Sequence, residues 1–133
     1  IRHRDLWDIP WIVRAQEIDF SAVAALVAAK HDDYRCPVPL ARMIAVGMQR
    51  AHVCYADGAF TGQMQRFYPL DRTHDFDNHC DALNAIVERC YGRVAASLGI
   101  SDQVEHARRR LATEISSGLI SATGMPKRNL VLS

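Results

Sequence analysis

The residues best suited to chemistry stand together at the start of the sequence, in the stretch IRHRDLWDIPW. If this stretch is helical, Arg4 and Asp8 are four residues apart and meet on one face, while Asp5 and Asp8 are three apart. Trp7 and Trp11 lie on a different face, so the turn has a charged edge and an aromatic edge. The charge pattern alone favours a simple interpretation, a capped helix with a surface ion pair worth roughly a few tenths of a kcal/mol.

A second cluster of reactive side chains lies in the stretch THDFDNHCD, residues 73–81. It contains residue types that bind zinc, namely His74, Asp75, Asp77, His79, Cys80 and Asp81. However, His74 and His79 are five residues apart, which does not place them on one helical face. The favoured interpretation is the first turn of a helix, with Asp75 or Asp77 as its N-cap. The sequence therefore predicts no metal site here.

The four cysteines form no CxxC motif, and we expect reduced, partly buried thiols.

Two basic stretches are candidates for nucleic-acid contacts. The segment QRFYPLDR, residues 65–72, mixes aromatic and basic side chains, but a helix end packed by aromatic residues is the commoner arrangement. The segment HARRR, residues 106–110, is typical of a solvated helix face. A net charge of +1 gives no support for non-specific binding to phosphates. The sequence also contains no phosphate-binding glycine loop, no GxSxG motif and no HExxH motif.

Helical periodicity dominates the sequence and predicts the elements that position these residues. Helices are expected at residues 21–31, 40–55, 61–68 and 76–98, at the N-terminus, and from Ser101 onward. Asp19 and Ser21 are candidate N-caps, and Pro39 can start the helix that follows it. Pro10 has no N–H, so it either kinks the opening helix and leaves a carbonyl near Leu6 without its helical partner, or it ends the first turn early.

Length and composition indicate one soluble domain. The chain has 133 residues, 49% of them hydrophobic and 23% charged, which is ordinary for a globular protein with a buried core. We expect an all-α helical bundle of about five or six helices, a single domain over residues 1–133 that ends in an antiparallel helical hairpin. No apolar run is long enough to span a membrane and no signal peptide is evident, so we expect a cytoplasmic protein without a membrane partner.

The stretch HRDLWDIPWIVRAQEIDF resembles the RDxxD-bearing segment of the AbiEii/AbiGii nucleotidyl transferase toxin family. These proteins are the toxins of type IV toxin–antitoxin and phage abortive-infection systems. Two further segments, KHDDYRC and FTGQMQRFYPL, are similar to the helical region that follows in some members, but less specifically. The resemblance covers roughly residues 1–70.

The resemblance implies a nucleotide site that is built from two parts. In the family, a Gly-Ser turn and a DxD carboxylate pair bind Mg²⁺ and a nucleoside triphosphate, and the RDxxD segment completes the site. Arg4 would then bind phosphate, and Asp5 or Asp8 would orient that arginine or the outer shell of the metal. An RNA acceptor such as tRNA and an antitoxin are the partners that the family suggests.

The sequence departs from the family because it contains no GS…DxD segment. Asp75 and Asp77 form a DxD, but it follows the RDxxD segment and has no Gly-Ser turn before it. We therefore expect the C-terminal helical half of an AbiEii-like toxin, with the N-terminal nucleotidyl transferase domain missing and no cofactor or transfer activity in this chain alone. The alternative is a stand-alone, non-enzymatic helical module that binds a partner protein such as an antitoxin.

Overall fold

The computed structural model describes the backbone of residues 3–66 and 76–122. Within these ranges it describes all side chains except those of residues 3, 4, 7, 64, 65 and 76–79. The described residues form six helices and no β-strand, which confirms the all-α prediction. The helices are α1 (His3–Ala15), α2 (Phe20–Asp33), α3 (Leu40–Ala56), α4 (Gly58–Gln65), α5 (Phe76–Ser97) and α6 (Ser101–Ser116).

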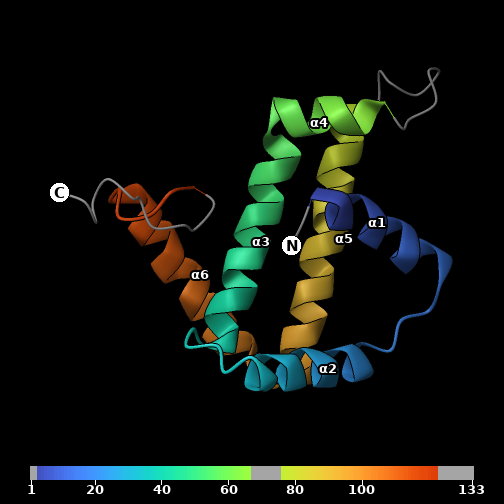
Figure 1. The fold of residues 1–133 in the computed structure, drawn as a ribbon. Helices are drawn as coiled ribbons and strands as arrows, with labels where there is room; N and C mark the ends of the chain where they lie inside the picture. Colours follow the sequence, from blue (N-terminus) through green and yellow to red (C-terminus); the bar gives the residue numbers. More distant parts are fainter. Residues whose placement is uncertain (1–2, 67–75, 123–133) are drawn as a thin grey trace.

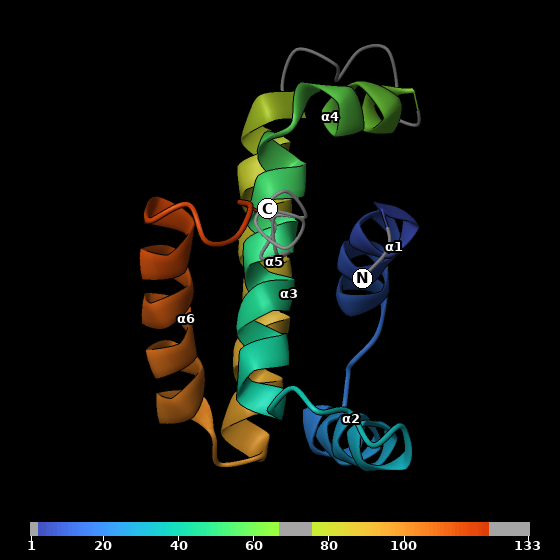
Figure 2. The same cartoon turned by 60° about the vertical axis from the view of Figure 1, so that its left-hand side comes forward.

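Two long helices, α3 and α5, run antiparallel through the centre of the molecule (Figure 1). Helix α2 crosses one end of this pair and α4 covers the other end. Helices α1 and α6 lie on opposite sides of the pair, as Figure 2 shows most clearly. The expected hairpin of α5 and α6 is present, although α6 packs mainly against α3. Its connection turns at Gly99, whose φ of +69° is a conformation that glycine adopts without strain.

The starts of three helices follow from the residues that precede them. The Asp19 side chain accepts hydrogen bonds from the backbone N–H groups of Ser21 and Ala22, so Asp19 is the N-cap of α2 and the second candidate, Ser21, is not. Pro39 is the N-cap residue of α3, also as expected. The prediction for α4 began too late, because the Asp57 carboxylate accepts the backbone N–H of Ala59 and starts the helix there.

Helix α1 continues through Pro10 to Ala15, so the opening turn does not end early. The missing N–H of Pro10 removes the normal helical donor for the Leu6 carbonyl. The Tyr55 hydroxyl of α3 donates to that carbonyl instead, at an O···O distance of 2.5 Å. A backbone group that the proline leaves without a partner is therefore used to attach α1 to the central helices.

The core consists of two clusters of buried side chains along α3 and α5. The cluster nearer α4 contains Leu6, Ala51, Tyr55, Phe60, Cys80, Leu83 and Val87. The cluster nearer α2 contains Ala24, Ala41, Ile44, Met48, Val94, Ala95 and Val104. Tyr91 packs against both clusters. Leu6, from the RDLWDI motif, is completely buried and fixes the register of α1 on the core.

Candidate functional site

An open groove of about 640 Å³ runs between α1, α2 and α5. Helix α1 lies beside α5, and α2 crosses the end of α5 (Figure 1). Residues of all three helices line the groove. Its lining is mostly aliphatic and aromatic, and consists of Asp5, Asp8, Ile9, Ile12, Val13, Ile18, Phe20, Val23, Val27, Ile44, Val87, Cys90, Tyr91 and Val94. A volume of this size with an apolar lining and few polar groups is typical of small-molecule sites.

Asp5 and Asp8 are the only carboxylates among the described residues that line this groove. Both are half-buried, because the α1 turn that carries them is held on the core by Leu6 and by the Tyr55 hydrogen bond. The groove therefore combines two hydrogen-bond acceptors at its α1 end with apolar walls elsewhere. The sequence predicts Asp5 and Asp8 as site residues, and the structure places both on a concave surface.

Tyr91 reaches the groove from α5 and packs closely on α3. A Cβ atom added at Gly47 would lie 2.6 Å from the Tyr91 hydroxyl oxygen, so only glycine leaves room for the ring in this position. Burial raises the pKa of the Tyr91 hydroxyl, with Arg50 opposing the shift and Asp5 adding to it. The phenol is thus a neutral group near the Asp5 end of the groove.

Positive charge lies beside the α2 end of the groove. The Arg93 guanidinium carbon is 4.5 Å from the centre of the Phe20 ring, which is the geometry of a cation–π contact between α5 and α2. Burial raises the pKa of the Cys90 thiol in the groove, while Arg93 and Arg89 act to lower it. Sequence reasoning missed these arginines, because they belong to no motif and only their four-residue spacing marks them.

The predicted residues outside the groove divide into two groups. Arg4 lies in α1, but its side chain is outside the described residues, as are His74, Asp75 and the side chains of Asp77 and His79. Cys80 is buried in the core and Asp81 is exposed. Within the described part of the chain, no group of three or more His, Cys, Asp or Glu residues could hold a metal ion. All four cysteines are free thiols, as the sequence predicts.

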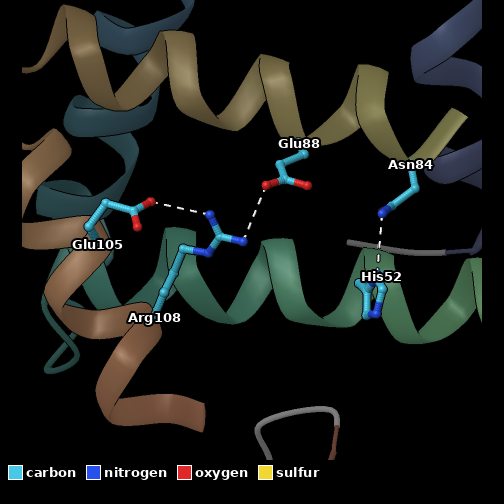
Figure 3. A network of polar contacts seen from close by, with 5 residues as sticks. All are labelled: His52, Asn84, Glu88, Glu105 and Arg108. Atoms are coloured by element: carbon cyan, nitrogen blue, oxygen red, sulfur yellow. Dashed lines mark hydrogen bonds and ion pairs between the residues drawn. The ribbon is translucent and has the colours of Figure 1, made fainter. Parts of the chain in front are cut away.

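Arg108 of the HARRR segment belongs to a separate polar surface between α5 and α6. Arg108 donates from its two terminal nitrogens to Glu105 and Glu88, each at 3.2 Å (Figure 3). Nearby, the Asn84 amide and the His52 ring are 3.3 Å apart. Because these groups are largely exposed, such ion pairs contribute at most about 1 kcal/mol each. This surface matches the predicted solvated helix face.

Mg²⁺ and a nucleoside triphosphate, which the family resemblance implies, fit the groove in part. Two carboxylates are suitable oxygen donors for a hydrated Mg²⁺ ion, which usually takes one or two protein carboxylates together with phosphate oxygens. Apolar and aromatic walls suit a nucleobase. Beside the carboxylates, however, a triphosphate would be repelled unless a metal ion or cations from elsewhere neutralised it.

Comparisons with protein-family models, with curated proteins and with solved structures find no match to this chain. Among the helices in the described part of the chain, none has the length and hydrophobicity needed to cross a lipid bilayer.

Proposed function

We propose that this chain is the helical portion of an AbiEii-like nucleotidyl transferase toxin and forms one wall of its nucleotide site. The observation that carries the proposal is the position of Asp5 and Asp8. These two residues of the RDLWDI motif line an apolar groove of about 640 Å³. A buried charged turn would have argued against the proposal, but both carboxylates are half-buried at an open surface.

The groove suits the nucleoside end of a nucleotide. A base can pack between aliphatic walls and the ring of Tyr91, and its amino group or the ribose hydroxyls can donate to Asp5 and Asp8. Mg²⁺, which supplies charge neutralisation at the phosphates when bound, would meet these carboxylates through its water ligands. On this proposal the two carboxylates bind and orient, and do not transfer the nucleotide.

The metal-binding GS…DxD segment of the family would be supplied by a separate nucleotidyl transferase domain, since this sequence contains no such segment. Nucleotidyl transfer generally depends on metal ions that clamp the reacting phosphates. We therefore expect the chain alone to bind nucleosides weakly and to be inactive. The full site would act in the cytoplasm on an RNA acceptor, under control of an antitoxin.

Titration of the ¹⁵N-labelled chain with adenosine, guanosine, cytidine and uridine tests the proposal. At least one nucleoside should shift the amide signals of α1 and α5 residues that line the groove. Asp5→Asn and Asp8→Asn should weaken this binding about tenfold, because each removes a charge-assisted hydrogen bond. Asp33→Asn, at an exposed position in α2, is the matched control and should bind normally. No groove-localised shift with any nucleoside would refute the proposal.

A second candidate function, the binding of a partner protein such as an antitoxin, is favoured by two exposed apolar side chains on α1. Trp11 is 61% exposed and Ile12 is 47% exposed, and Ile12 also lines the groove. Sedimentation with the product of the neighbouring gene would separate the candidates. Ile12→Asp should abolish a protein complex, whereas Asp5→Asn should leave it intact if the groove carboxylates serve only a nucleoside.

A further inference from the structure

Two arginines of α5 lie close to the groove, although neither is one of its lining residues. Arg89 and Arg93 are four residues apart, so they lie on the same side of α5, next to the groove residue Cys90. Both arginines are exposed. Among the described residues, no carboxylate forms an ion pair with either of them. Their guanidinium groups are therefore available to a ligand.

The contact with Phe20 holds one of these arginines at the groove. The Arg93 guanidinium lies over the Phe20 ring at 4.5 Å, and Phe20 is itself a groove wall. A guanidinium that is stacked on an aromatic ring keeps its N–H groups at the ring edge, where they can bind phosphate oxygens in pairs. Because the ring restrains the side chain before any ligand arrives, less entropy is lost on binding.

Carboxylates and an arginine lie near different ends of the groove. Asp5 and Asp8 lie on α1 at one end, and Arg93 lies over Phe20 at the start of α2 at the other. The hydroxyl and amino groups of a nucleotide can donate to the carboxylates, and its phosphates are attracted to Arg93.

We propose that Arg89 and Arg93 form the phosphate-binding end of the groove and fix the direction in which a nucleotide lies in it. This inference rests on the proposed function, since it assigns a role within the same site. It names the ligand class as a nucleoside phosphate, with the nucleoside toward α1 and the phosphates toward α2. On this proposal Arg89 and Arg93 bind the phosphates, and no residue of this chain contacts the bond that reacts.

Comparison of a nucleoside with its own triphosphate tests the inference. The probes are the nucleoside that binds best and the matching triphosphate with Mg²⁺, titrated into the ¹⁵N-labelled chain at low and at moderate salt. The triphosphate should bind at least about tenfold more tightly than the nucleoside at low salt, and added salt should reduce this advantage. The double variant R89Q/R93Q should remove the advantage.

Matched variants separate a binding role from a structural one. R110Q, at an exposed arginine on α6 on the opposite side of the central helices, should keep the full triphosphate advantage. R93K retains the charge but not the paired N–H geometry, and should lose part of the advantage. Unchanged nucleoside binding by R89Q/R93Q shows that the groove is still folded.

The possible failures are distinguishable. If a nucleoside binds but its triphosphate binds no more tightly, or if R89Q/R93Q keeps the full advantage, the inference is overturned while the proposed function stands. If R89Q/R93Q weakens nucleoside and triphosphate equally, the arginines only support the groove wall, and the inference is again overturned. If neither probe binds in the groove, the proposed function fails and takes the inference with it.

Discussion

The hydrogen bond between Tyr55 and Leu6 determines how firmly the motif-bearing helix is attached. Pro10 cannot donate to the Leu6 carbonyl, and the Tyr55 hydroxyl does so across 2.5 Å in a buried position. The substitution Tyr55→Phe leaves this carbonyl without a donor and changes little else in the core. An unsatisfied buried carbonyl costs about 1–3 kcal/mol, so the free energy of unfolding should fall by that amount.

A second substitution isolates the cause. In a Pro10→Ala chain the alanine N–H can donate to the Leu6 carbonyl, so Tyr55→Phe should then cost less than about 1 kcal/mol. Pro10→Ala also removes buried ring atoms. The double-mutant cycle subtracts this loss, because it is the same in the single variant Pro10→Ala and in the double variant. The coupling energy between the two positions should therefore be about 1–2 kcal/mol.

Urea unfolding of the four proteins, followed by far-ultraviolet circular dichroism, measures this coupling. Tyr34→Phe is the control, since Tyr34 is 77% exposed, and it should leave the midpoint unchanged. If Tyr55→Phe costs the same in the Pro10→Ala chain as in the chain that keeps the proline, the hydroxyl does not compensate for the proline, and the reasoning is wrong.

Three further predictions concern the groove and the packing of the helices. Gly47→Ala should destabilise the fold by about 1 kcal/mol in urea unfolding, because overpacking against Tyr91 outweighs the gain in helix propensity. Gly92→Ala should stabilise the fold by about 1 kcal/mol, because a Cβ atom at this position has no neighbour within 4 Å. The raised pKa of Tyr91 means that the native state holds its proton more tightly than the unfolded state, so stability should fall as the pH rises above the ordinary value of 10.0, and Tyr91→Phe should reduce this fall. Glu114→Gln should lower the free energy of unfolding by about 0.5–1 kcal/mol in urea, since it weakens the 2.5 Å contact that joins Arg42 of α3 to α6. A cost equal to that of the same substitution at an exposed glutamate would show that solvent screens this ion pair.

The parts of the fold that were predicted from sequence are those that local chemistry determines. The Asp19 cap, which was one of two candidates, and the helix start after Pro39 each depend on a single residue type and its neighbours. The start of α4 was missed because the Asp57 cap lies in a short Asp-Gly segment that also fits a plain turn. The donor to the Leu6 carbonyl could not be named, because Tyr55 comes from a distant part of the chain.

The candidate site was predicted only in part for the same reason. The motif marked Asp5 and Asp8, but it gave no indication of the surface that they face. The groove is formed where α1 and α2, which follow one another in the sequence, pack beside the distant helix α5. Arg93 is placed near the groove by its contact with Phe20, a contact between α5 and α2 that no local pattern encodes. The binding of a nucleotide by Asp5 and Asp8 stays a prediction.

The shared position of Tyr91 has a consequence for how the molecule opens. Two core clusters lie at different ends of α3 and α5, and Tyr91 contacts both. Amide hydrogen exchange should therefore resolve two cooperative units, one holding α1 and α4 and the other holding α2 and the start of α6, with Tyr91 at the boundary. The groove crosses this boundary, because residues of both α1 and α2 line it. A ligand in the groove would join the two units, and its binding energy would appear as slower exchange at both ends of the molecule.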